Sequence, residues 1–247
     1  MPRFFVESHN IVSDTVTVCG DDAHHISRSL RMAVGEHITV CDSAANEYDC
    51  VLTDFLPDCV RARILSRKKQ DTEPPCFVTL YQALPKGDKL DTVIQKAVEC
   101  GVSRIVPFES ERCVVRVKPE AEEKKLQRRA RIAAEAAKQC GRGILPQVCG
   151  TVSFEEMLSL AGEAELTLFC FEGEGTEPIS RILQAARPKR GSQIALIVGS
   201  EGGFSLSEAA DAKARGFQMT GLGKRILRTE TASPFALACI SSVLELQ

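Results

Sequence analysis

The pattern of hydrophobic and polar residues changes near residue 75. Before this point, apolar and polar residues alternate over short runs at positions 38–40, 48–52 and 60–64. Alternation with a period of two is typical of half-buried β-strands, and the polar run 42–46 is typical of a turn between two of them. Short strands with little helix predict a small β-barrel that ends near residue 70. Residues 70–75 are polar, and their two prolines predict a stiff linker.

From residue 76 onward, short apolar runs alternate with helical patterns. Strands are predicted at residues 76–83, 103–108, 166–171 and 193–198, and helices at residues 120–139, 205–216 and 233–246. Another helix is predicted from the spacing of Leu90, Val93, Ile94, Ala97 and Val98, which places these five residues on one face. The alternation predicts a mainly parallel sheet with helices on both faces. We therefore expect two domains, over residues 1–70 and 76–247.

Local signals add detail to the predicted helices. Ser205 and Glu208 form a capping-box pattern, and Gly101 is placed as the C-cap of the first α/β helix. The helix at 120–139 carries a stripe of small residues that predicts close packing on a neighbour: Ala130, Ala133, Ala134 and Ala137.

Composition narrows the classes of function. The chain has no Trp and only two Tyr, so a sheet of aromatic platforms that stack on single-stranded RNA is not expected. Its formal net charge is -2, which excludes coating of nucleic acid by bulk electrostatics. Any contact with RNA must therefore come from local basic patches.

The eleven cysteines do not indicate a disulfide framework or a metal site. No Cys-x-x-Cys pair occurs, and the start of the chain lacks the apolar core of a signal peptide. Most cysteines are therefore expected to be reduced and buried as small hydrophobic residues. The apolar run 194–198 is far shorter than the ~20 residues that a membrane span needs. These features predict a soluble cytoplasmic protein with no bound metal and no membrane segment.

Two glycine-containing loops follow predicted strands, at residues 199–205 and 221–232. Parallel sheets bind ligands at the carboxyl ends of their strands. The chain has no phosphate-binding loop of the Gly-x-x-x-x-Gly-Lys type and no Gly-x-Gly-x-x-Gly motif. A cofactor without phosphates, such as S-adenosylmethionine, suits loops of this kind. From the glycines alone, an ordinary strand-to-helix turn is the simpler interpretation of the first loop.

Longer motifs carry a family resemblance. Residues 197–205 and 222–232 closely resemble the RsmE family, the 16S rRNA uracil-N3 methyltransferases of the SPOUT superfamily. Further ordered matches cover most of the chain, at residues 2–5, 25–32, 82–89, 95–96, 110–113 and 135–142. One departure is Ser200, where the family usually has proline, and we expect it to loosen the turn slightly.

The resemblance implies a fold, a cofactor and a partner. The expected fold is an N-terminal PUA-like β-barrel followed by a C-terminal SPOUT α/β domain with a deep trefoil knot. The knot is expected to bind S-adenosylmethionine, and the enzyme is expected to be a homodimer with its active site at the subunit interface. The residues that match the cofactor loops are Gly199, Glu201, Gly202, Gly203, Leu222, Gly223, Ile226 and Leu227.

The implied reaction is methyl transfer to N3 of a uridine in the decoding region of 16S rRNA. The N3 proton must leave, and negative charge spreads onto the uracil oxygens during attack. Arg228 is predicted to stabilise that charge, and Glu230 is predicted to act as base or to orient Arg228. The alternative is a structural Arg–Glu pair that caps the last helix.

RNA contacts are predicted from basic and matched-motif residues: Arg3, Arg28, Arg31, Gln139 and Arg142. A charged helix face is often only solvated surface, so this alternative stays open for each cation. Two other functions compete with the expected one. The first is a non-catalytic rRNA-binding assembly factor, which the intact loops argue against. The second is a SPOUT methyltransferase that acts on another RNA.

Overall fold

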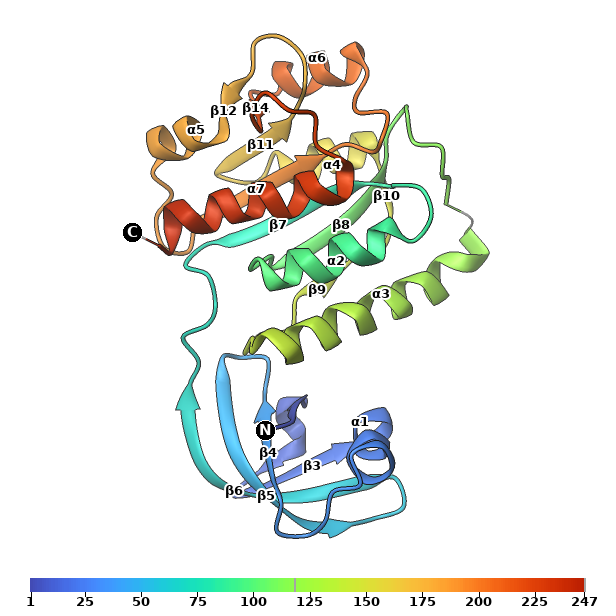
Figure 1. The fold of residues 1–247 in the computed structure, drawn as a ribbon, viewed down its shortest axis with the longest axis vertical. Helices are drawn as coiled ribbons and strands as arrows, with labels where there is room; N and C mark the ends of the chain where they lie inside the picture. Colours follow the sequence, from blue (N-terminus) through green and yellow to red (C-terminus); the bar gives the residue numbers. More distant parts are fainter. Residues whose placement is uncertain (118, 247) are drawn as a thin grey trace. The chain divides into compact units, whose positions relative to one another are not determined.

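The computed structural model describes residues 1–117 and 119–246, which form two compact units, each built on its own sheet (Figure 1). The first unit comprises Met1–Glu73 together with Ala137–Leu145. The second comprises Pro74–Ala136 and Pro146–Gln247. The last residues of helix α3 (Pro119–Cys140) therefore belong to the first unit, while most of the helix belongs to the second.

The first unit contains a six-stranded sheet with the order β1-β4-β5-β6-β3-β2. Its strands are β1 (Arg3–Phe5), β2 (Ile11–Val12), β3 (Thr15–Cys19), β4 (His37–Cys41), β5 (Asn46–Phe55) and β6 (Cys59–Lys69). Helix α1 (Gly20–His24) follows β3 and continues into a wider turn, η2 (His25–Ser29). The residues that alternate into the core include Ile38, Val40, Tyr48, Cys50 and Leu52, all buried, which confirms the predicted period of two.

The sheet of the first unit is open. Strands β1 and β2 form its two edges, and within the residues that the structure describes no ladder joins one edge to the other. The closed β-barrel expected from the sequence is therefore not found. The hydrophobic pattern fixes which face of each strand is buried, but it carries no information on whether the two edge strands pair.

A disulfide joins Cys19 to Cys59 across β3 and β6. The two residues are directly opposite in the antiparallel ladder, with their Cα atoms 4.2 Å apart. This corrects the expectation of reduced cysteines for these two residues, which lie 40 positions apart and become neighbours only through strand pairing. Cys41, Cys50 and Cys76 are free cysteines, and all three are buried.

A buried ion pair attaches the segment Ala137–Leu145 to the rest of the first unit. The carboxylate of Glu73 accepts a hydrogen bond from Nη2 of Arg142 at 2.6 Å and bonds from the backbone N–H groups of Gly143 and Ile144 at 2.9 and 3.0 Å. Charge-assisted bonds of this kind are stronger than neutral ones. Glu73, which lies in the predicted linker, thus has a structural role in the first unit.

The second unit is built on an eight-stranded sheet in which every pairing is parallel. Its strands are β7 (Phe77–Ala83), β8 (Arg104–Glu109), β9 (Gln147–Val148), β10 (Val152–Ser153), β11 (Leu166–Cys170), β12 (Glu177–Pro178), β13 (Gln193–Val198) and β14 (Gln218–Gly221). The order is β10-β8-β7-β13-β11-β14-β12, with β9 paired to β8. This confirms the predicted parallel sheet.

The helices of this unit are α2 (Lys89–Glu99), α4 (Phe154–Ala161), α5 (Ile179–Ala186), α6 (Leu206–Ala214) and α7 (Thr229–Leu244), besides most of α3. Helix α7 packs against α2 and α5, and α4 packs against β8 and β10 (Figure 1). The five residues predicted to share one face of α2 are all buried. The predicted capping box of α6 is present, with reciprocal bonds between Ser205 and Glu208.

Two predictions about helices were wrong in detail. Helix α7 begins at Thr229, four residues before the predicted start, because the carbonyl of Arg228 accepts bonds from the N–H groups of Thr231 and Ala232 at 2.8 Å each. Pro234 lies inside this helix and removes only one backbone donor. The buried face of α3 also differs from the stripe of alanines that the sequence predicted.

On α3 the buried alanines are Ala133, Ala136 and Ala137, while Ala130 is exposed and Ala134 half-buried. Arg129 is buried on the same face and lies 3.5 Å from Glu122. An ion pair thus occupies the place where the sequence predicted only small residues.

Candidate active site

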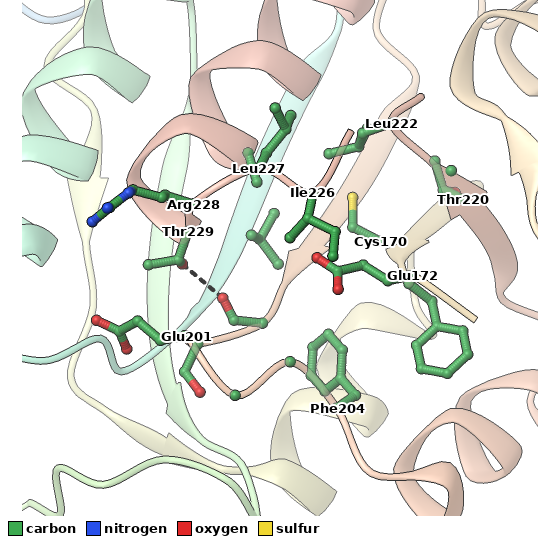
Figure 2. A pocket seen from close by; sticks show the side chains of 18 of the residues that line it. Cys170, Glu172, Glu201, Phe204, Thr220, Leu222, Ile226, Leu227, Arg228 and Thr229 are labelled. Atoms are coloured by element: carbon green, nitrogen blue, oxygen red, sulfur yellow. Dashed lines mark hydrogen bonds between the residues drawn. The ribbon is translucent and has the colours of Figure 1, made fainter. Parts of the chain in front are cut away.

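A cavity of about 650 Å³ opens at the carboxyl ends of β11, β13 and β14 (Figure 2). Its walls come from the loop after β13, the loop after β14 and the residues that follow β11. Crevices of this size at the carboxyl ends of parallel strands are typical of cofactor sites.

The loop after β13 needs its glycines for close backbone approach. A Cβ on Gly199 would lie 3.2 Å from the Cα of Gly203 and 3.2 Å from the ring of Phe204. Gly203 has a φ of +62° and donates its N–H to the carbonyl of Ser200 at 3.0 Å. Phe204 is buried, and its ring centroid lies 4.3 Å from that of Phe169 on β11. The aromatic contact anchors one end of the loop while its backbone faces the cavity.

The loop after β14 supplies the opposite wall. Gly223 adopts a φ of +109°, and the side chain of Ile226 is 81% exposed at the cavity. All eight residues predicted to bind the cofactor line this cavity: Gly199, Glu201, Gly202, Gly203, Leu222, Gly223, Ile226 and Leu227. The structure thus brings both predicted loops together around one space.

A buried polar network connects the two loops. The amide nitrogen of Gln82, on β7, donates to Oγ1 of Thr229 at 2.9 Å and to the carbonyl of Gly199 at 3.3 Å. Thr229 in turn donates to the carbonyl of Gly199 at 2.7 Å, the bond dashed in Figure 2. Ser233 completes the network by donating to the side-chain oxygen of Gln82. Fully satisfied networks of this kind fix the geometry of their surroundings.

Charged groups gather at one side of the cavity. Nζ of Lys89, at the start of α2, lies 2.7 Å from Oε1 of Glu201 and 3.7 Å from Oε2 of Glu230. The hydrogen bond to Glu201 raises the pKa of Lys89. Burial opposes ionisation of Glu201, but the bonds from Lys89 and from the N–H of Lys86 outweigh it and lower the pKa of Glu201. Both side chains are therefore held in their charged forms near neutral pH.

Arg228 and Glu230 have different surroundings. Arg228 is exposed and lines the cavity, and within the described residues no ion pair engages its guanidinium. One carboxylate oxygen of Glu230, Oε2, is buried without a hydrogen-bond partner. The structure contains no ion pair between Arg228 and Glu230 in the described part of the chain, so the alternative of a structural pair that caps α7 is not observed. The roles of both residues in catalysis stay predictions.

Comparison with known proteins identifies the family. Residues 72–241 match the profile of the RNA methyltransferase domain, and residues 18–54 match that of the RNA methyltransferase PUA domain. The ribosomal RNA small subunit methyltransferase E of Bacillus subtilis is 32% identical, with 100% of this chain and 98% of the relative covered. The same-named protein of Synechocystis is 34% identical, with 98% and 78% covered. The chain belongs to this family, RsmE.

A solved structure with the same family name shares the fold. It is a ribosomal RNA small subunit methyltransferase E from Neisseria gonorrhoeae bound to S-adenosyl methionine. It is 33% identical to this RsmE chain, with a TM-score of 0.82 and 98% of each chain covered. The family resemblance recognised in the sequence is confirmed.

Several cavity residues of this RsmE chain escaped sequence reasoning. Glu172 follows β11 and points into the cavity in Figure 2, and Arg112 donates from Nη1 to the carbonyl of Gly202 at 3.0 Å. Lys89 also lines the cavity. A signal for Glu172 was available, because it follows a buried parallel strand as the two recognised loops do. Lys89 and Arg112 lie in the matched motifs 82–89 and 110–113, but no role at the cavity was predicted for them, because their partners lie about a hundred positions away in the sequence.

The five predicted RNA-binding residues of the RsmE chain fall into two groups. Arg28, Arg31 and Gln139 are exposed. Arg3 is held 2.7 Å from Glu47, and Arg142 is buried against Glu73. RNA binding stays a prediction for all five, and the exposed three are free of the structural ion pairs that hold the other two.

Within residues 1–117 and 119–246, no group of three or more His, Cys, Asp or Glu side chains is placed to hold a metal ion. Over the same residues, no helix combines the length and the apolar character needed to cross a bilayer.

Proposed function

We propose that this RsmE-family protein transfers a methyl group from S-adenosylmethionine to N3 of a uridine in 16S rRNA of the small ribosomal subunit. The observation that carries the proposal is the convergence of both family loops on one cavity. It is supported by the names of the curated relatives and by the S-adenosyl methionine bound to a relative of the same fold.

The cavity fits this cofactor in size and in chemistry. Its volume is within the range of small-molecule sites, and its loops offer backbone groups rather than a phosphate cradle. Oγ of Ser200 is buried at the cavity without a hydrogen-bond partner in the described residues, so it is available to a ligand. The Glu172 carboxylate faces the space, which suits a ligand with two cationic centres. When bound there, S-adenosylmethionine would supply an activated methyl group.

The protein side chains then have to position uracil and stabilise its charge. Arg228 is assigned the role of stabilising the negative charge that develops on the uracil oxygens, because its guanidinium is exposed, unpaired and at the cavity. Burial of Oε2 in Glu230, and its proximity to Lys89, favour a place in the ion cluster of Lys89 over the role of a base. Arg28, Arg31 and Gln139 are assigned to contacts with RNA.

The finer architecture is also part of the proposal. We assign a trefoil knot to the second unit. We further propose a homodimer with the cavity at the subunit interface. Support comes from two exposed apolar side chains that line the cavity, Leu206 at 79% and Ile226 at 81%. Light scattering after size exclusion should give about twice the 26.9 kDa chain mass.

The proposed activity is tested with radiolabelled S-adenosylmethionine, the purified protein and small subunits that lack the modification. Label in 16S rRNA together with a primer-extension stop at one uridine would support catalyst, cofactor and target. Cofactor binding without transfer to small subunits or free rRNA would favour another RNA target. Neither binding nor transfer would favour the non-catalytic assembly factor.

A further inference from the structure

Three charged side chains from distant segments meet beside the cavity. Lys89 is the first residue of α2, Glu201 lies in the loop after β13, and Glu230 lies in the first turn of α7. The ammonium group lies 2.7 Å from one carboxylate and 3.7 Å from the other. Each of these side chains is between 23% and 32% exposed, so the group is partly shielded from water. One lysine thus engages both carboxylates.

The place of the lysine is unfavourable by itself. The N-terminus of a helix carries partial positive charge, and a cation there is destabilising. Lys89 occupies this place on α2, and Arg228 occupies the N-cap of α7, a helix that packs against α2. Two neighbouring helix N-termini thus carry cations that are unfavourable there. Departures of this kind from local preference are expected at functional sites.

A second cation, Arg228, lies near the carboxylates that Lys89 engages. Glu201 and Arg228 point to the same side of the cavity in Figure 2, and Glu230 is two residues from Arg228 in the sequence. Arg228 is close enough for its charge to affect Lys89, although the hydrogen bond that Lys89 donates to Glu201 has the larger effect on the pKa of Lys89 and raises it. Without the lysine, Arg228 would be a cation on the same side of the cavity as Glu201 and two residues from Glu230 in the sequence.

We propose that Lys89 is a positioning residue that occupies Glu201 and Glu230 and thereby keeps the Arg228 guanidinium unpaired for the substrate base. This inference rests on the proposed function and on the role assigned there to Arg228. A guanidinium neutralised by a carboxylate stabilises developing negative charge far less than a free one. Lys89 therefore acts on the reaction through Arg228, without contact with the reacting atoms.

The test compares single and double variants in the methylation assay with small subunits. Lys89→Met should lower kcat by about tenfold to a hundredfold. This loss does not exceed the one typical for direct removal of a charge-stabilising donor. The Kd for S-adenosylmethionine, measured by calorimetry, should change by less than about threefold, because backbone groups supply most of the cofactor site. Lys89→Arg, which keeps the positive charge, should retain more activity than Lys89→Met.

The decisive variant is Lys89→Met combined with Glu230→Gln, which removes a carboxylate that could capture Arg228. We expect this double variant to recover a large part of the kcat lost in Lys89→Met. A merely structural role of Lys89 would make the second substitution neutral or harmful. Lys96→Met is the matched control, because Lys96 is also on α2 and pairs with Glu99 at 2.9 Å, but does not line the cavity.

The outcomes separate this inference from the proposed function. If the wild-type protein transfers no methyl group, the proposed function fails. If the wild type is active and Lys89→Met matches it, the inference fails alone. It also fails if Lys89→Met binds the cofactor normally and stays inactive after Glu230→Gln. Thermal melting of each variant excludes loss of the fold as the cause.

Discussion

Arg228 is the residue on which the proposed chemistry depends most. Its side chain is exposed at the cavity, whereas the predicted cofactor contacts are mainly backbone groups. Arg228→Ala should therefore reduce the rate of methyl transfer by about 10²-fold to 10³-fold while cofactor affinity changes little. Radiolabel transfer and calorimetry measure the two quantities. Arg215→Ala, at a surface arginine paired with Glu155, is the control, and equal losses of transfer and affinity in Arg228→Ala would refute the assignment.

Gly199 tests the packing of the first cavity loop. A methyl group there would be 3.2 Å from the Gly203 Cα and from the Phe204 ring, and the backbone atom cannot give way easily. We expect Gly199→Ala to weaken cofactor binding by at least about tenfold, because the loop backbone must shift from its ligand-facing position. Gly150→Ala is the matched control, since a Cβ there meets nothing within 4 Å. Unchanged affinity in Gly199→Ala would show that the loop is not a cofactor wall.

At the residue scale, the sequence identified groups in contiguous motifs and missed those brought in from elsewhere. The eight residues assigned to the cofactor were found because they lie in two contiguous motifs. Lys89 was missed as a site residue because its partners, Glu201 and Glu230, are more than a hundred positions away. The same limit applies to Arg142, whose burial depends on Glu73 in the linker. Local patterns identify ligand loops, but ion-pair partners require the fold.

At the scale of elements, the N-terminus of α6 joins two loops. Glu208 closes the capping box with Ser205 and is only 5% exposed, and its Oε1 accepts a bond from the N–H of Glu111 at 2.8 Å. Glu111 follows β8, so this carboxylate attaches a second loop to the helix start. Loss of this carboxylate should therefore affect the loop after β8 as well as α6.

Replacing Glu208 by Ala should lower the free energy of unfolding by about 2 to 3 kcal/mol, because it removes the capping box and leaves buried N–H groups unpaired. Urea denaturation followed by circular dichroism measures the change. Glu156→Ala is the matched control, because Glu156 occupies the equivalent place on Ser153-capped α4 but is exposed. Its cost should be below about 0.5 kcal/mol. Similar costs for both variants would contradict a tertiary role for Glu208.

Elements with strong local signals were predicted well, and their long-range relations were not. The face of α2 and the cap of α6 follow from spacing and from one side chain, which the sequence shows directly. The early start of α7 depends on the carbonyl of Arg228, which accepts backbone hydrogen bonds from Thr231 and Ala232. The open form of the first sheet and the Cys19–Cys59 disulfide both depend on which strands pair. The periodicity of the sequence does not specify strand pairing.

For the whole molecule, charge distribution matters more than net charge. A chain with formal charge -2 gains no general attraction to RNA, so binding must come from a few exposed cations. Several basic side chains are already engaged by carboxylates, as Arg3 is by Glu47 and Lys138 is by Asp22. Only cations that are not held in this way can replace counterions on phosphates.

The salt dependence of RNA binding therefore reports which cations contact phosphates. Removal of both Arg28 and Arg31 should reduce the slope of log Kd against log salt by about 1.4 to 1.8, since each neutralised phosphate contributes about 0.7 to 0.9. Filter binding of 16S rRNA over a range of potassium chloride concentrations measures the slope. Arg181→Ala with Arg190→Ala is the control, because these arginines are also exposed but lie outside the predicted RNA set. If the two double variants change the slope equally, attraction is a property of the whole surface and the predicted contacts are wrong. A change confined to the first pair would instead place phosphates beside the turn that follows α1, in the first unit.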